Sequence, residues 1–313
     1  MIRVSSSKIY DLLLKYDRQR SSELTRKTEE LSSGKSILYP SDAPVDTARY
    51  LRLDRFSGKL DRLNKNIDLI LSFVDSAESI MASAVDDMQE ARVRFVQILN
   101  TGVISEDEAQ TLADYFSSIK GHILQLGNEK VGDSHLFGGV KTQTPPFADD
   151  GTYQGSTEET TVPVASGVEE NVNFNGKEYF AVNNSSGKML AVEVLDKIVE
   201  IIESGDIDRL HTETITVDLG DGAEEMKLLD AFDAALSKMM QYRSILGTKQ
   251  KLLDNLKVQN ESMSLRLREL SSKLKDVDYP EAIAEYEKAK TAYQALLAAI
   301  SQTQQISLLN YLQ

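Results

Sequence analysis

Few residues in this sequence have the types and spacing that chemistry requires. The run Gly34-Lys35-Ser36 matches the end of a phosphate-binding loop, in which backbone amides and a lysine hold phosphate groups. That motif also needs a glycine at position 29 after a strand, and this chain has Glu29 in a helical pattern. We therefore interpret Gly34 as the residue that ends one helix, and Pro40-Ser41-Asp42-Ala43-Pro44 as the start of the next.

No pattern typical of a metal or catalytic site is present. The histidines are His122, His135 and His211, and no two are spaced as ligands on one helix face. The run Asp218-Leu219-Gly220-Asp221-Gly222 lacks the alternating oxygen ligands and final glutamate of a calcium loop. Zero cysteines exclude disulfides, thiolate metal sites and a cysteine nucleophile. We expect no catalytic, metal or cofactor-binding residues, no cofactor and no enzymatic activity.

The negative charge is concentrated in the middle of the chain. The formal net charge is −14, and residues 141–225 contribute −13 of it, from 18 acidic and 5 basic residues. A nucleic-acid-binding protein would carry a basic surface, so nucleic acid is not an expected partner. The segment is interpreted as a solvated, repulsive surface. No apolar run is long enough to span a membrane, and Met1 to Arg20 shows no secretory signal pattern.

Long helices must supply the framework. Between residues 53 and 98, apolar residues recur at alternating spacings of three and four, which is a heptad stripe typical of a long helix packed on partners. Ser105-Glu106-Asp107-Glu108 predicts a capping box and a further helix up to Leu126. A second long heptad segment precedes Tyr279-Pro280, which interrupts or restarts the helix. The predicted rod core consists of Leu53, Phe56, Leu60, Leu63, Ile67, Ile70, Val74, Phe95, Ile98, Leu246, Leu253, Leu267 and Leu274.

The two chain ends carry thinner apolar stripes. Arg20 and Lys27 interrupt the first stripe, and glutamines dilute the last one. A helix with a thin apolar face is marginal alone, so we expect both ends to be disordered or frayed in the free chain and ordered on assembly. The predicted residues of this terminal coiled coil are Ile9, Leu13, Tyr16, Leu24, Leu31, Tyr293, Leu297, Ile300, Leu308, Leu309 and Leu312.

The middle of the chain has turn and strand chemistry. Asn175-Gly176 between two short apolar runs predicts a β-hairpin. Helix is expected again from Leu190 to Glu203, ending near Gly205, and a strand-and-turn excursion within 212–225. The expected fold class is mainly α: an elongated helical bundle or coiled coil formed by both chain ends, with a small β-rich insert. As an exposed surface domain, the insert should tolerate deletion of residues 145–185.

Several short runs occur in a specific order along the two helical arms. They are Arg3-Val4-Ser5, Leu31-Ser32-Ser33-Gly34-Lys35, Tyr39-Pro40-Ser41-Asp42-Ala43-Pro44, Ala91-Arg92-Val93-Arg94-Phe95-Val96-Gln97, Asn100-Thr101-Gly102, Leu136-Phe137-Gly138-Gly139, Arg243-Ser244-Ile245-Leu246-Gly247-Thr248, Asp276-Val277-Asp278-Tyr279, Tyr293-Gln294-Ala295-Leu296-Leu297 and Ser307-Leu308-Leu309-Asn310-Tyr311-Leu312. Together they resemble the flagellin family over both arms, and the middle insert is not covered. The two prolines at 40 and 44 resemble family members at the hook–filament junction more than flagellin, although Ala43 departs from the junction pattern.

This resemblance implies a division of the chain and a structural role. It implies inner terminal coiled-coil segments at 1–40 plus 280–313, a helical rod at 41–140 plus 188–279, and a surface insert at 141–187. The implied role is to join the hook to the filament of the bacterial flagellum, outside the cell, after passage through the flagellum's own export apparatus without a cleaved signal. The implied partners are further copies in a ring or short helical layer, another hook-associated protein, flagellin or an adjoining junction protein, and an export chaperone.

Two other functions remain open from the sequence. One is a flagellin-type filament subunit, and the other is a cytosolic helical scaffold or signalling module that shares only the heptads. The hypothesis that the chain is an enzyme rests only on the insert, to which no role is assigned.

Overall fold

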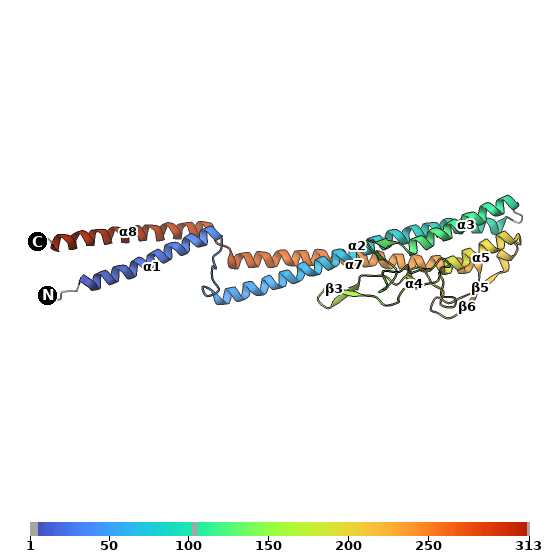
Figure 1. Ribbon diagram of the computed structural model, residues 1–313, viewed down its shortest axis with the longest axis horizontal. Helices are drawn as coiled ribbons and strands as arrows, with labels where there is room; N and C mark the ends of the chain where they lie inside the picture. Colours follow the sequence, from blue (N-terminus) through green and yellow to red (C-terminus); the bar gives the residue numbers. More distant parts are fainter. Residues whose placement is uncertain (1–5, 102–104, 312–313) are drawn as a thin grey trace. The chain divides into compact units, whose positions relative to one another are not determined.

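The computed structural model describes residues 6–101 and 105–311, and most of them are helical (Figure 1). The helices are α1 (Ser6–Ser33), α2 (Pro44–Asn100), α3 (Glu106–Gly127), α4 (Gly176–Tyr179), α5 (Leu190–Ser204), α6 (Arg209–Thr212), α7 (Leu228–Lys275) and α8 (Tyr279–Tyr311). The strands are β1 (Lys130–Val131), β2 (Ser134–His135), β3 (Thr161–Ala165), β4 (Val168–Asn171), β5 (Thr214–Val217) and β6 (Glu224–Lys227), in three antiparallel pairs. The predicted mainly α class is confirmed.

Local sequence signals explain where the helices begin and end. α1 stops at Gly34, whose φ of 69° is the left-handed conformation that glycine adopts without a steric penalty. Pro44 then occupies the first position of α2, where its missing N–H has no helical partner to lose. At the start of α3, Ser105 and Glu108 form the predicted reciprocal capping box. These boundaries agree with the sequence-based expectations.

The chain forms two compact units. We name Met1–Lys59 with Ser262–Gln313 the terminal unit, and Leu60–Glu261 the core unit. The boundaries fall within α2 and α7, whereas the sequence-based division falls near residues 40 and 280 and separates 141–187. The difference at 141–187 has a physical reason: buried residues of that segment belong to the same hydrophobic cluster as the neighbouring helices.

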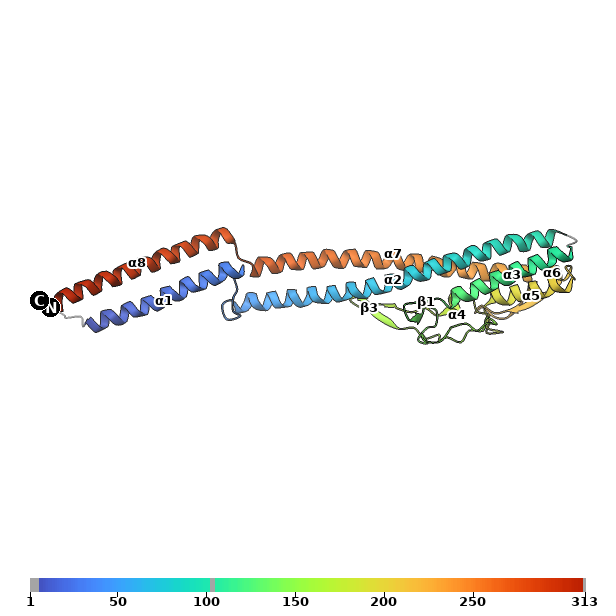
Figure 2. The ribbon, with the colours of Figure 1, turned by 45° about the horizontal axis from the view of Figure 1, so that its top comes forward.

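The core unit contains nearly all of the buried apolar side chains. Its main helices are α3, α5 and the parts of α2 and α7 within 60–261, with α3 and α5 in close contact (Figure 2). The heptad stripe of α2 is buried without a break from Leu60 to Ile98, and side chains of α2 contact both α7 and α3 along it. The predicted rod-core residues that are buried here are Leu60, Leu63, Ile67, Ile70, Val74, Phe95, Ile98, Leu246 and Leu253.

The predicted hairpin at Asn175-Gly176 is wrong. Asn175 is instead the N-cap of α4, and its side chain accepts a hydrogen bond from the Lys177 amide. A helical turn forms here because it places two aromatic residues of one run, Tyr179 and Phe180, into the core. The hairpin of this region is β3–β4, whose turn contains Gly167 with φ 79°.

The insert 141–187 is part of the core unit's interior. Four aromatic side chains of this insert are buried, and they pack edge-on or tilted against one another and against the buried Phe137: Phe147, Phe174, Tyr179 and Phe180. The ring of Tyr179 also packs on Tyr242 of α7, with centroids 5.0 Å apart. The structure therefore reverses the expectation for deletion of residues 145–185: deletion should open the hydrophobic core.

Candidate assembly surface

The first and last helices pair along a narrow seam. α1 and α8 lie side by side in both views (Figures 1 and 2), and they approach closely. Among the described side chains of α8, Ala282 and Ala289 are the buried apolar ones, and their small size permits this close approach. The facing stripe of α1 contains Leu13, Leu24 and Leu31, each half-buried. The seam thus buries small residues and only parts of large ones.

The seam differs by one position from the predicted stripe of α8. The half-buried residues of α8 include Tyr286, Tyr293, Leu296 and Ile300, which continue the spacing set by the two alanines. Leu297 lies beside this stripe and is 44% exposed. A step of one residue rotates a helical side chain by about 100°, so Leu297 points away from α1. Leu296, which the prediction omitted, takes its place in the seam.

The remaining predicted terminal residues fall into two groups. Tyr16 is exposed on α1, on a face that α8 does not cover. Ile9, Leu308 and Leu309 belong to α1 and α8, but their side chains are outside the described part, and Leu312 lies outside the described residues.

Two predicted rod-core residues in the terminal unit are only half-buried, and a third is exposed. Leu53 and Leu274 are half-buried, and Leu267 is buried. The prediction differs from the structure at Phe56, which is 49% exposed. The reason is that α7 packs on the face of α2 that carries Ser57, through the buried contact between Ser57 and Ser264, and this leaves the Phe56 side chain uncovered.

The terminal unit buries very little apolar surface. Of the buried apolar residues in the described part of the chain, only Leu267, Ala282 and Ala289 belong to it. The core unit supplies all of the others. A helical segment with so few buried apolar groups gains little hydrophobic stabilisation from its own fold.

The same unit exposes an unusual number of large apolar side chains. Thirteen of the twenty-one exposed large apolar residues in the described part of the chain belong to it, although it is the smaller unit. They are Leu12, Leu14, Tyr16, Tyr39, Val45, Leu51, Phe56, Met263, Leu265, Leu270, Tyr279, Ile283 and Leu297. So many exposed large apolar side chains in one helical unit indicate surfaces that other protein chains cover. We call these residues the assembly surface.

Most of the assembly surface lies outside the predicted site residues, because those residues follow a single apolar stripe on each helix. Leu12, Leu51 and Leu265 lie off the heptad positions that face the partner helix within the chain. A second set of apolar residues on a helix predicts a second partner, and this signal was available in the sequence.

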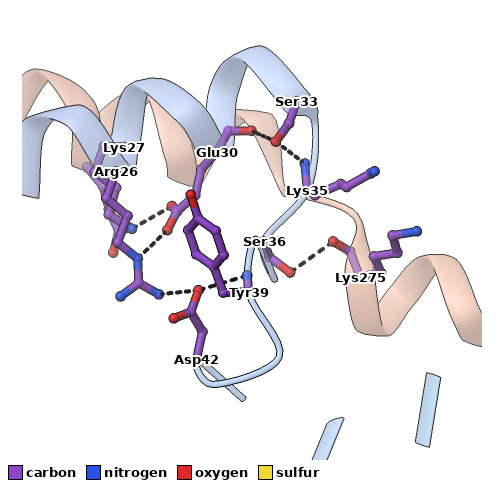
Figure 3. A network of polar contacts seen from close by, with 10 residues as sticks. Arg26, Lys27, Glu30, Ser33, Lys35, Ser36, Tyr39, Asp42 and Lys275 are labelled. Atoms are coloured by element: carbon purple, nitrogen blue, oxygen red, sulfur yellow. Dashed lines mark hydrogen bonds and ion pairs between the residues drawn. The ribbon is translucent and has the colours of Figure 1, made fainter. Parts of the chain in front are cut away.

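A polar network holds the turn between α1 and α2 (Figure 3). Glu30 is only 6% exposed, and its carboxylate accepts hydrogen bonds from Arg26 at 3.2 Å and Lys27 at 2.8 Å. Arg26 also lies 3.6 Å from Asp42, whose carboxylate accepts a bond from the Tyr39 amide. A buried carboxylate requires such partners, so the network fixes the end of α1 relative to the turn.

The turn is also joined to the end of α7. The amide and hydroxyl of Ser36 both donate to the Lys275 carbonyl, at 2.7 and 3.1 Å (Figure 3). The Val277 amide donates to the Gly34 carbonyl at 3.0 Å. Lys275 in turn donates to the Tyr50 hydroxyl at 2.9 Å and lies over that ring. The connections α1–α2 and α7–α8 therefore form one hydrogen-bonded joint.

One ion pair crosses the seam between α1 and α8. Lys27 lies 2.5 Å from Glu285 as well as 2.8 Å from Glu30. Burial acts to lower the Lys27 pKa, but the hydrogen bonds to Glu285 and Glu30 outweigh it and the pKa is raised. The hydrogen bond from Lys27 lowers the pKa of Glu285. The lysine that interrupts the apolar stripe in sequence is thus a polar cross-link in the seam.

In the described part of the chain, no helix is long and apolar enough to cross a bilayer. The same residues include no group of three or more histidine, aspartate or glutamate side chains placed to hold a metal ion.

Comparison with known proteins places the chain in a family. Residues 5–142 match the bacterial flagellin N-terminal helical region, and residues 229–312 match the bacterial flagellin C-terminal helical region. The chain is 24% identical to the flagellar hook-associated protein 3 of Escherichia coli, over 98% of both chains. It is 24% identical to a flagellin of Halalkalibacterium halodurans, over 88% of this chain and 86% of that one.

The fold agrees with a solved structure. The crystal structure of Bacillus cereus FlgL superposes with a TM-score of 0.57 and 18% identity, covering 71% of this chain and 99% of that chain. Since the two matched family regions together include both helical arms, the chain belongs to the bacterial flagellin family.

Proposed function

We propose that this protein is a structural subunit of the bacterial flagellum that joins the hook to the filament. One observation carries the proposal: in its described part, the terminal unit exposes thirteen large apolar side chains and buries three apolar residues. Such a unit completes its hydrophobic core only when neighbouring subunits cover it. Its function is therefore assembly, and no catalysis is required of it.

The junction role is favoured over a filament subunit by the extent of the similarity. The alignment with the E. coli hook-associated protein 3 extends over 98% of both chains, whereas the alignment with the H. halodurans flagellin covers 86% of that flagellin. The identity is 24% in both cases, so the coverage is what separates them. The turn with Pro40 and Pro44 supports the same choice.

A cytosolic scaffold module is disfavoured by the assembly surface. A protein that works as a monomer in the cytosol normally covers apolar clusters of this size, because exposed ones promote association. The partners that we propose are further copies in a ring or short helical layer, a hook-associated protein on the hook side, and flagellin or an adjoining junction protein on the filament side. We also propose export through the flagellar apparatus, with a chaperone holding the terminal helices before assembly.

Deletion of the gene in its motile source organism tests the role. Hooks without filaments, together with flagellin released into the medium, support a junction protein. Loss of flagellin itself would assign the chain to the filament, and intact motility would remove it from the flagellum. Complementation with the parent chain is the control.

A further inference from the structure

One face of α2 in the terminal unit combines basic and apolar residues. Ala48, Leu51, Arg52, Arg55, Phe56 and Lys59 line a surface groove of about 490 Å³. All six side chains are exposed. Within the described part of the chain, no ion pair forms with Arg52, Arg55 or Lys59. Three cations therefore surround an apolar groove without a counter-charge.

The groove faces away from the partner helix inside the same chain. Ser57 marks the side of α2 that meets α7, through its contact with Ser264 at 3.2 Å. At 3.6 residues per turn, Leu51, Arg55 and Lys59 lie on roughly the opposite side of the helix. The chain's own α7 cannot cover them, and the apolar residues indicate that another surface does.

The terminal unit also carries a segment of complementary chemistry. Asp276 and Asp278 precede α8, and Glu281 lies in its first turn. Between and after these carboxylates, Tyr279 and Ile283 are exposed large apolar residues one turn apart. We call residues 276–283 the acidic segment. It offers carboxylates and two apolar side chains, which is what a basic apolar groove would accept.

We propose that the groove on α2 binds the acidic segment of a second copy of this chain. This deepens the proposed function, on which it rests, because it names the contact between neighbouring subunits. The two surfaces differ, so the contact is head-to-tail: it leaves a pair of copies with a free groove on one copy and a free acidic segment on the other. Repetition of such a contact produces a ring or a helical layer rather than a closed dimer.

The size of the contact fits a protein that assembles only in its final location. A stable pairwise interface buries about 800 Å² on each partner, and six side chains on one helix provide less. The contact is therefore weak between two free chains. It becomes effective when several contacts form at once in the assembled flagellum.

Charge reversal in a deletion strain tests the pairing. Arg52→Glu with Arg55→Glu, or Asp278→Lys with Glu281→Lys, should each strongly reduce the fraction of hooks that carry filaments. The chain that combines all four changes should restore that fraction to near the parent level, because opposite charges face each other again. The pairing would be overturned if both two-residue variants kept the parental fraction of hooks with filaments. It would also be overturned if the four-residue variant did not recover that fraction.

Cross-linking gives a second measurement that reverses no charges. The chain has no cysteine, so introduced thiols are the only ones it contains. Co-expression of Arg55→Cys and Glu281→Cys chains should give an oxidised dimer in isolated flagella. The matched control pairs Arg55→Cys with Val258→Cys, on an exposed site of α7, and should give none. The proposal would be overturned if the Arg55→Cys chain were cross-linked to a different protein. It would also be overturned if the control pair gave as much oxidised dimer as the test pair. If the deletion strain itself kept its filaments, the junction role would fail instead.

Discussion

Replacement of Leu297 by aspartate should separate assembly from folding. Leu297 is 44% exposed in α8, outside the seam with α1. Complete burial of a leucine contributes about 1.5–3 kcal/mol, so roughly half-burial contributes about 1 kcal/mol in the single chain. In an assembly that covers the side chain, Leu297→Asp would also bury a carboxylate without a partner, which costs several kcal/mol more. The variant should fold and fail to assemble.

Two comparisons make this prediction quantitative. Phe95 is completely buried in the core unit, and Phe95→Ala should lower the free energy of unfolding by about 3–5 kcal/mol. Leu252→Asp is a control that matches Leu297 in exposure and differs from it in location, because Leu252 is 43% exposed and belongs to the core unit. Urea unfolding followed by circular dichroism measures stability. Electron microscopy of complemented cells counts hooks with filaments.

The expected pattern is specific. Leu297→Asp and Leu252→Asp should both unfold close to the parent, and only Leu297→Asp should lose filaments. If Leu297→Asp destabilised the single chain as much as Phe95→Ala, the exposure-based reasoning would be refuted. If it assembled as well as the parent, the role of this face of α8 would be wrong.

Three further predictions concern single features. Gly34→Ala should lower stability by about 1 kcal/mol in urea unfolding, because φ is 69° and a β-carbon there would lie 2.9 Å from the Tyr279 hydroxyl; an unchanged midpoint would contradict the strain. The hydrogen bond from Lys27 lowers the pKa of Glu285, so the stability that this pair contributes is complete above about pH 4.3 and is lost as the pH falls through the folded pKa. The loss of helicity on acidification should therefore be smaller in Lys27→Met than in the parent chain. Deletion of residues 145–185 should give an unfolded or insoluble chain, because four buried aromatic rings leave the core, and a soluble variant with parental unfolding would refute this.

Much of the helical framework could be predicted because its signals are local. The stripe from Leu60 to Ile98 has a strict heptad period, and one buried face is enough to produce it. Gly34, Pro44 and Ser105 act through their own backbone or side-chain geometry, so their positions predict helix ends directly.

The failures arose where long-range packing decides between local alternatives. Asn175-Gly176 favours a hairpin turn, but Asn175 caps a helix equally well, and the burial of Tyr179 and Phe180 decides in favour of the helix. Leu296 and Leu297 are equivalent in sequence, and the alanines at 282 and 289 select which one enters the seam. The heptad alone does not contain that choice.

Hydrogen exchange on the free chain and on isolated flagella tests the central claim most directly. Amide protection follows buried apolar contacts, which are few among the described side chains of α1 and α8 and numerous in the stripe of α2 within Leu60–Ile98. Slow exchange is expected in that part of α2 in both samples. Fast exchange is expected in α1 and α8 of the free chain, with strong protection of both helices after assembly. Equal protection of α1 and α8 in the two samples would contradict the claim that neighbouring subunits complete their core.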